Sequence, residues 1–326
     1  MSCKGLSLMS GGLDSQLAVR VLERAGAEVE CVCFETPFFS SANARKAAAA
    51  LGVKLHVLDF TEDEVSLLEN PPHGFGGAMN PCIDCHATMI RRAGELMASL
   101  GYDFVATGEV QGQRPMSQNK QSLCTVEKSS GLKGRLIRPM SAKLLEPTIP
   151  EIEGKLDREK LLDISGRSRD RQIALAKEFG ITDYPSPAGG CKLTEEAYGC
   201  KLKDLMEHEG LRDKATGTVN RALLDLLAVG RRFRLPGGSS VILGRDATEN
   251  ARLEKGIFAA ILKPTNGIPG PTAAIPVLVS ESDLSLAQSL VNAYVRGTTP
   301  ADRLPFRPYQ LACTVPVRQI ESVPDK

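Results

Sequence analysis

The first part of the chain alternates short apolar runs with segments whose apolar side chains recur every three or four positions. The apolar runs have the length of buried strands, and the periodic segments are typical of amphipathic helices. Strands are predicted at residues 4–9, 28–34, 54–60 and 102–107, and helices at residues 15–24, 41–51 and 87–100. This order predicts an α/β fold: a parallel sheet of the five-stranded type with helices on both faces.

The second part of the chain has a different pattern, with helical periodicity first and short strands later. Helices are predicted at residues 157–164, 168–179, 201–209, 218–229, 247–255 and 283–295, and strands at 257–262, 275–279 and 310–319. Residues 231–244 read as two strands around a Gly-Gly turn. We expect three domains: residues 1–150, a helical extension over 151–215 that carries Cys191, and a small α+β domain over 216–326.

The first predicted strand runs directly into Ser-Gly-Gly-Leu-Asp-Ser, residues 10–15, and then into a helix. Glycines allow a tight turn and a close approach of the backbone to a ligand. Exposed N–H groups and the positive end of the helix attract phosphate. Asp14 suits the orientation of Mg²⁺ or of a phosphate-bound water. In a parallel sheet, ligands bind beyond the carboxyl ends of the strands, where residues 10–15, 36–40 and 107–109 all fall.

This stretch, LSLMSGGLDSQLAVRVLERAG, resembles the PP-loop of the N-type ATP pyrophosphatases over about residues 1–200. The resemblance implies an adenine nucleotide alpha hydrolase-like fold, ATP and Mg²⁺ as cofactors, and cleavage of ATP to AMP and pyrophosphate. The segments TGE…GQ…SQ, residues 107–118, and RLIRPM, residues 135–140, are similar to segments of tRNA 4-thiouridine synthases. The nucleotide-binding residues so implied are Ser10, Gly11, Gly12, Asp14, Ser15, Phe34, Thr107, Gly108 and Glu109.

The cysteines supply an independent argument for sulfur chemistry, because a thiolate is both a nucleophile and a metal ligand. Cys82 and Cys85 form a CxxC motif that we expect on the loop before a helix, and Cys191 lies in a Pro/Gly-rich loop. Together they resemble the three-cysteine site of iron–sulfur-dependent tRNA thiolases, and the resemblance implies a 4Fe-4S cluster with one open iron.

Other interpretations of these cysteines stay open. A structural zinc site would take its fourth ligand from Cys200 or His86. A CxxC redox disulfide would work with Cys191 as a persulfide carrier, and the spacing can also be coincidental. Cys31 and Cys33 lie on an apolar strand, so we expect them to be core residues.

The third predicted domain contains a Gly-Arg-x-x-x-x-Asn element, residues 244–250, which resembles the RNA-binding domain of NFACT-type proteins. Clustered arginines around the hairpin would bind phosphates in a salt-dependent manner, although a solvated hairpin is equally compatible with them. The arginines of this patch are Arg231, Arg232, Arg234 and Arg245. Those that would extend it are Arg167, Arg169 and Arg171.

Composition narrows the choice of partners. The 326 residues carry a net charge of +1, so any contact with nucleic acid depends on a local patch. No apolar run is long enough to span a membrane, and the first residues do not resemble a secretion signal. We therefore expect a cytoplasmic protein with no membrane partner, whose nine cysteines are reduced. A homo-oligomer is compatible with the sequence.

Together these features predict a tRNA sulfurtransferase that adenylates a uridine and replaces AMP with sulfur. Asp14, Cys82, Cys85 and Cys191 would be catalytic, with tRNA and a sulfur donor (sulfide or a cysteine desulfurase) as partners. In contrast to the 4-thiouridine synthases, this protein is expected to have neither an N-terminal tRNA-binding extension nor a rhodanese-like domain. The expected lack of a rhodanese-like domain favours sulfide or a cluster over a persulfide relay. The alternatives are a small-molecule ligase or amidating enzyme of the same superfamily, and an RNA-binding protein with structural zinc.

Overall fold

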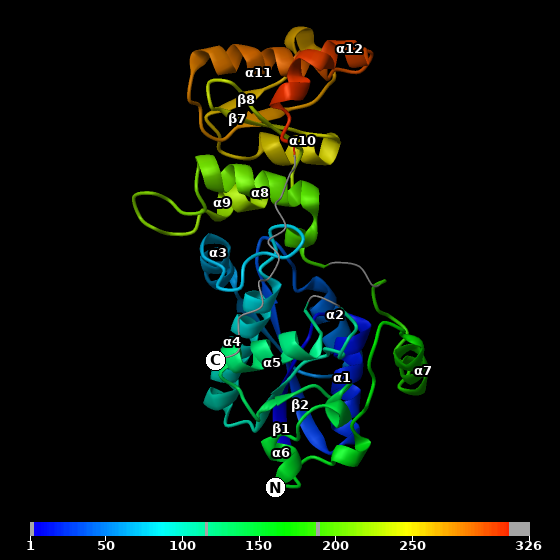
Figure 1. Cartoon of the computed structure of the whole chain (residues 1–326). Coiled ribbons are helices and arrows are strands. Elements are labelled where there is room, and N and C mark those ends of the chain that lie inside the picture. Colours follow the sequence, from blue (N-terminus) through cyan, green and yellow to red (C-terminus); the bar gives the residue numbers. More distant parts are fainter. Residues whose placement is uncertain (1–2, 115–116, 187–189, 313–326) are drawn as a thin grey trace. The chain divides into compact units, whose positions relative to one another are not determined.

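The computed structural model describes residues 3–114, 117–186 and 190–312 (Figure 1). The chain divides into two compact units, with the division between Thr194 and Glu195. The segment that follows residue 150, as far as Thr194, belongs to the same unit as the first strands. Within the described ranges no helix combines the length and the apolar character that crossing a membrane requires.

The first unit is built on five parallel strands in the order β3-β2-β1-β4-β5, which confirms the predicted sheet. The central strand is β1, in which Ser7 lies opposite Cys31 on one side and Ala106 on the other. The loop after β1 is therefore at the middle of the carboxyl edge, the usual ligand position in such sheets. The strands are β1 (Cys3–Leu8), β2 (Ala27–Glu35), β3 (Leu55–Asp59), β4 (Phe104–Ala106) and β5 (Leu136–Ile137).

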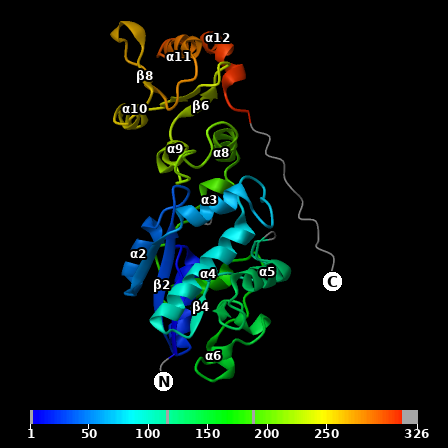
Figure 2. The same cartoon turned by 90° about the vertical axis from the view of Figure 1, so that its left-hand side faces the viewer.

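Helices cover both faces of this sheet, because side chains along each central strand alternate between two cores. Cys3 and Cys31 face a layer made of α1 (Leu13–Arg24), α2 (Ala42–Leu51) and α7 (Asp170–Glu178). Leu6 and Val32 face the opposite layer, in which Figure 2 shows α4 (Cys82–Leu100) and α5 (Lys120–Ser130) lying across the strands.

The expectation that Cys31 and Cys33 are core residues is confirmed, since they are 0% and 4% exposed. A further short helix of the first unit is α6 (Ile149–Ile152).

Among the described residues, three helices of the first unit were not predicted, namely α3 (Thr61–Glu69), α5 and the short α6, and one predicted helix is wrong. The helices α3 and α5 begin where Asp59 and Asn119 accept hydrogen bonds from backbone N–H groups of the first turn. Residues 157–164 form only a short 3₁₀ turn, Arg158–Lys160. Backbone hydrogen bonds from residues 162 and 164 to carbonyls of 139 and 140 keep this segment extended.

The second unit contains a four-stranded antiparallel sheet in the order β6-β7-β9-β8, and its β6–β7 hairpin is the predicted one. Gly238 at the turn has φ +97°, a left-handed conformation that favours glycine. The predicted strand at 275–279 is displaced, because Pro276 has no N–H to donate and β9 ends before it. The strands are β6 (Arg231–Arg234), β7 (Ser240–Leu243), β8 (Ala260–Leu262) and β9 (Ala273–Ile275).

Five helices accompany this sheet: α8 (Glu196–His208), α9 (Arg221–Leu226), α10 (Ala247–Glu254), α11 (Glu281–Ala293) and α12 (Pro300–Arg303). Of the strand predicted at 310–319, Gln310 makes one isolated bridge to Phe233. Residues 313–319 of that prediction lie outside the described residues.

We predict that Gly5→Ala destabilises the first unit. A Cβ on this residue would lie 2.3 Å from the ring of Phe104, which is opposite it on β4. Overpacking of this kind costs about 1–3 kcal/mol of unfolding free energy, measured by urea denaturation. Gly77→Ala is the control, because a Cβ there has nothing within 4 Å. The double variant with Phe104→Leu should regain part of the loss, and equal stabilities of both alanine variants would contradict the prediction.

Candidate nucleotide and sulfur site

The turn between β1 and α1 is held by backbone crowding that excludes side chains. Gly11 has φ +82°, and a Cβ there would lie 2.4 Å from the carbonyl carbon of Asn43. A Cβ on Gly108 would lie 2.7 Å from the backbone nitrogen of Ser15. The loop after β4 is therefore pressed against the first turn of α1, and the two predicted glycine-rich segments share one edge of the sheet.

Hydroxyl groups inside the turn keep its shape. The Ser15 hydroxyl donates to the Gly12 carbonyl at 2.8 Å, and the Gly12 N–H donates to Ser10 Oγ at 3.3 Å. Gln16 Nε2 donates to the carbonyls of Gly11 and Asp183, both at 3.0 Å. No side chain in the described ranges caps the N-terminus of α1, so its first N–H groups are available to an anion.

Asp14 lies in this first turn and is largely buried. Its Oδ2 accepts a hydrogen bond from Gln113 Nε2 at 3.1 Å, whereas its Oδ1 has no partner among the described residues. Burial raises the pKa of Asp14, and the hydrogen bond from Gln113 and the charges of Arg169 and Arg114 act in the opposite direction. Gln172 also lies close enough to lower the pKa of Asp14 through a hydrogen bond, although Oδ1 has no hydrogen bond of standard geometry in the described residues.

Thr107 and Glu109, the other predicted nucleotide residues at this edge, belong to a buried ionic cluster. Glu109 Oε2 accepts from the Thr107 hydroxyl at 3.0 Å and from Arg138 Nε at 2.9 Å. His86 Nδ1 lies 3.3 Å from Glu109 Oε1. Burial alone would raise the pKa of Glu109, but Arg138 and His86 outweigh it and lower the pKa to about 2. Glu109 is thus an ionised group that anchors the loop from within.

Phe34, which the resemblance also assigned to the nucleotide, is packed inside the unit. The side chain is 7% exposed, and its ring meets that of Phe60 edge-on with centroids 5.3 Å apart. It lies near the carboxyl end of β2, one strand away from the turn after β1.

The two cysteines of the CxxC motif lie in the first turn of α4, not on a loop before it as expected. Cys85 is buried, and the half-buried Cys82 accepts a hydrogen bond from Asn80 Nδ2 at 3.1 Å. Cys191 reaches the same region, since the N–H of Lys192 donates to the carbonyl of Phe38 at 3.1 Å.

The three thiols lie close enough to interact electrostatically. Burial raises the pKa of Cys85, with Glu64, Cys191 and Cys82 adding to the effect. Burial likewise raises the pKa of Cys191 to about 12, and Glu64 and Cys82 contribute. The predicted sulfur residues are therefore neighbours although two come from α4 and one from a distant loop.

Glu64 is a member of this cluster that the sequence analysis missed. The residue is 0% exposed, and neither carboxylate oxygen has a hydrogen bond of standard geometry within the described part of the chain. The Cys85 thiol lies against it, and burial raises the pKa of Glu64 to about 7. A signal was present, because Glu64 falls on the apolar stripe of α3 with Thr61, Val65 and Leu68.

Neither residue proposed as a fourth zinc ligand is available in the way expected. His86 contacts Glu109, and Cys200 on α8 is disulfide-bonded, so the expectation that all nine cysteines are reduced is wrong. Nowhere in residues 3–114, 117–186 and 190–312 are three or more His, Cys, Asp or Glu side chains arranged to hold one metal ion.

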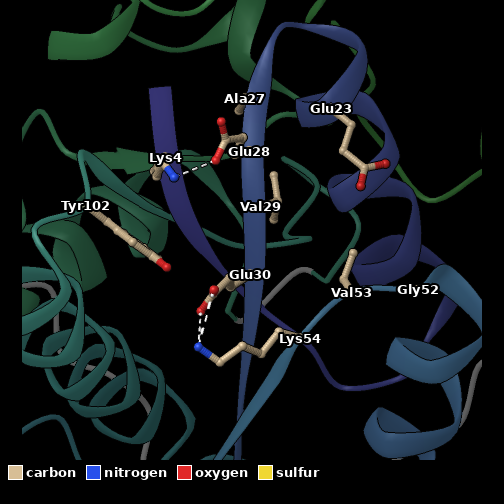
Figure 3. Close-up of a pocket in the computed structure, with 10 residues that line it drawn as sticks. All are labelled: Lys4, Glu23, Ala27, Glu28, Val29, Glu30, Gly52, Val53, Lys54 and Tyr102. Carbon is tan, nitrogen blue, oxygen red and sulfur yellow. Dashed lines mark hydrogen bonds and ion pairs between the residues drawn. The ribbon is translucent and has the colours of Figure 1, made fainter. Parts of the chain in front are cut away.

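The first unit has one surface pocket beside this site and another at the opposite edge of the sheet. One of about 170 Å³ opens beside Gly11 and is lined by Lys46 and Asp183, whose charged groups are 2.6 Å apart. The other, of about 440 Å³, lies at the opposite, amino edge of the sheet (Figure 3). Lys4 in that pocket pairs with Glu28 at 2.7 Å, as the stick view shows. Because its charges are already paired, we assign no ligand to the amino-edge pocket.

In the second unit, the expected cationic patch is largely neutralised. Arg232 is 3% exposed, and its Nε donates to Asp204 at 3.2 Å. Arg234 pairs with Asp204 at 2.6 Å and with Glu209 at 2.8 Å. Arg245 pairs with a glutamate one helical turn further on, Glu249. Of the four arginines, Arg231 makes a different contact, over the ring of Tyr294 at 5.6 Å.

The Gly-Arg-x-x-x-x-Asn element has a structural role here. Asn250 Oδ1 accepts from the N–H of Thr272 at 3.0 Å, and its amide donates to the Gly270 carbonyl at 3.3 Å. A Cβ on Gly244 would lie 2.1 Å from Asn250 Oδ1, so glycine is required there. The element holds the loop before β9, and the resemblance to an NFACT-type RNA-binding domain stays a prediction.

Comparison with known proteins confirms the PP-loop resemblance over the first part of the chain. Residues 1–143 match the family model described as Thiamine biosynthesis protein (ThiI). Among curated proteins, the chain is similar to the tRNA-specific 2-thiouridylase MnmA of Sulfurimonas denitrificans, with 38% identity over 120 residues, 33% of this chain and 35% of the relative. It is also similar to a probable tRNA sulfurtransferase of Caldanaerobacter subterraneus subsp. tengcongensis, with 26% identity over 181 residues, 53% of this chain and 42% of the relative.

The chain thus spans between a third and a half of the length of these curated relatives. A solved structure described as a 4-thiouridine synthetase–RNA complex with bound ATP aligns with a TM-score of 0.38 and 22% identity. That alignment covers 55% of this chain and 52% of the other.

We predict that Glu109→Gln strongly destabilises the first unit. Removing the carboxylate leaves Arg138 buried without its main partner, which costs about 3–5 kcal/mol of unfolding free energy at pH 7. Because the pKa of Glu109 is lowered to about 2, its stabilising effect is present above the ordinary glutamate pKa of 4.5 and is lost as the pH falls toward 2. The measurement is denaturant unfolding of both proteins at pH 7 and at pH 3.

The matched control is Glu127→Gln, which removes the other carboxylate that contacts Arg138, at 3.3 Å. The Glu127 side chain is 28% exposed, so this change should cost less than about 1 kcal/mol. If both variants lose the same stability, the Glu109–Arg138 pair does not anchor the loop after β4.

Proposed function

We propose that this protein is an ATP-dependent tRNA thiolase, which adenylates a carbonyl oxygen of a uridine and then replaces AMP with sulfur. The observation that carries the proposal is one compact unit holding both an uncapped glycine turn at the centre of the carboxyl edge and three clustered thiols. The family match over residues 1–143 and the names of the curated relatives support it.

The geometry at the turn suits the first step. ATP is the substrate, and the first N–H groups of α1 bind its phosphates. Asp14 is the residue that would hold Mg²⁺, which would neutralise phosphate charge. The uridine carbonyl oxygen attacks the α-phosphorus, and the bond to the bridging oxygen breaks. Its electron pair leaves with pyrophosphate, so the products are an adenylated base and pyrophosphate.

The thiol cluster suits the second step. Soft thiolates are the ligands that iron–sulfur clusters take, and Cys82, Cys85 and Cys191 would hold a 4Fe-4S cluster. Ligands of a cluster bind different irons, so the three thiols would not need to converge on one point. Such a cluster would supply an iron without a cysteine ligand as a place for the sulfur donor. Sulfur adds to the activated carbon, and AMP leaves with the electrons of the carbon–oxygen bond.

The remaining partners follow from this chemistry. We propose tRNA as the acceptor, sulfide or a cysteine desulfurase as the sulfur donor, and the cytoplasm as the location, where the free thiols of Cys82, Cys85 and Cys191 would stay reduced.

Cys191→Ser should separate the two steps. We expect the variant, incubated without oxygen with Mg-ATP, sulfide and tRNA transcript, to form AMP while thionucleoside in the digested RNA falls at least about a hundredfold. Cys124→Ser is the control, because this thiol is exposed on α5 and both products should stay at the unmodified level.

Three results would contradict the proposal. The absence of AMP with every tRNA tested would remove the adenylation step. AMP formed with a small acid and without tRNA would indicate a ligase of the same superfamily. Zinc without iron in protein purified under argon, with no broad visible absorption, would exclude the cluster.

A further inference from the structure

The segment that leads into α7 lies beside the nucleotide turn. Ser165 bridges to Gln111, and the N–H of Gly166 donates to the Gln111 carbonyl at 2.8 Å. The helix α7 then packs against α1. These contacts carry Arg169 and Gln172 to the first turn of α1, although the sequence places them more than a hundred residues away.

Three polar groups at this place have atoms without a hydrogen bond of standard geometry in the described chain, although Gln172 lies close enough to Asp14 to lower its pKa through a hydrogen bond. Gln172 is 0% exposed, and neither its Nε2 nor its Oε1 has a hydrogen bond of standard geometry. The buried Nε of Arg169 and the buried Oδ1 of Asp14 also have no hydrogen bond of standard geometry in the described residues. A polar group buried in this way costs about 1–3 kcal/mol unless a ligand supplies the missing bonds.

These groups belong to one cluster, since both Arg169 and Gln172 act on Asp14 and lower its pKa against the effect of burial. Arg114 acts on Asp14 in the same direction. Two guanidinium groups and one carboxylate at the positive end of α1 leave an excess of positive charge. The chemistry that fits such a place is a polyphosphate.

The neighbouring arginines of the same segment behave differently. Arg171 is exposed and pairs with Asp163 at 2.6 Å, and Arg167 is exposed as well. The three arginines that were expected to extend an RNA surface therefore differ. Arg167 and Arg171 are exposed, whereas the Nε of Arg169 is buried. Gln172 is fully buried, so it does not belong to an RNA-binding surface.

We propose that Arg169 and Gln172 bind the β- and γ-phosphates of ATP, so that residues 165–172 form the second half of the nucleotide site. The inference rests on the proposed function only in taking ATP as the ligand. The pyrophosphate portion carries most of the charge of ATP, which matches two guanidinium groups, and the α-phosphorus stays open to the attacking oxygen. As the bond between the α-phosphorus and the bridging oxygen breaks, charge grows on pyrophosphate, and Arg169 stabilises it.

The test compares ligands that share or lack these phosphates. For Arg169→Ala, calorimetry with Mg-ATP and with inorganic pyrophosphate should show affinities about 10- to 100-fold below those of the unmodified protein. AMP affinity should change less than about twofold, because AMP lacks both phosphates. Gln172→Ala should show the same selectivity with a smaller loss, and Arg169→Lys should recover part of the ATP affinity.

Arg171→Ala is the matched control. Arg171 lies two residues after Arg169 and is exposed, so the variant removes the same charge from the solvent side of the segment. It should bind all three ligands as the unmodified protein does. Arg169→Gln, which keeps the three-carbon stem and a polar end without the charge, replaces the alanine variant if thermal unfolding shows that the latter does not fold.

Other outcomes would overturn the assignment. Equal losses of ATP and AMP affinity would indicate a purely structural role. Unchanged ATP affinity with weakened, salt-dependent tRNA binding would return Arg169 to an RNA surface. The ratio of ATP to AMP affinity is measured without tRNA or sulfur. A changed ratio therefore supports the assignment of Arg169 even if thiolation is not observed. Conversely, thiolation can be observed even if the ratio does not change, which would contradict only the assignment of Arg169.

Discussion

The contact on which the site depends is the approach of two backbone loops to the N-terminus of α1. Gly11 packs against the start of α2, and Gly108 packs against Asp14 and Ser15, at distances that no Cβ allows. Side chains are excluded on both sides of the turn. In the described chain, no capping side chain accepts a hydrogen bond from the first N–H groups of α1. The geometry that stabilises the turn is therefore also the geometry that leaves it ready to bind an anion.

Buried charge is treated in two different ways around this turn. Glu109 is satisfied by Thr107 and Arg138, which lie within hydrogen-bond distance, and it holds the loop after β4 in place. Asp14 and Glu64 have oxygens without a hydrogen bond of standard geometry in the described residues, one at the nucleotide turn and one beside the thiols. A folded chain retains such groups at a cost in stability, so their positions mark where ligands complete the structure.

The same contrast separates the two units. Arg232 and Arg234 of β6 are neutralised by Asp204 of α8 within the second unit. Such pairs fix the packing of a helix on a sheet and leave little charge for a nucleic acid. In the first unit, by contrast, Arg169 faces a cluster that its own chain does not fill.

Local signals in the sequence were sufficient for the strands, the glycine turn and the grouping of Cys82 and Cys85, because strand periodicity, turn residues and a CxxC spacing act over a few positions. They were not sufficient for α3, whose first backbone N–H donates to Asp59, nor for residues 157–164, which pair with a distant segment. Which arginines are free, that Glu64 faces Cys85, and that Gln172 reaches Asp14 were decided only by the tertiary structure. The reason is physical: the burial of a polar group and the partners it finds are set by chain segments that are far apart in sequence and meet only when the sheet has its helices on both faces.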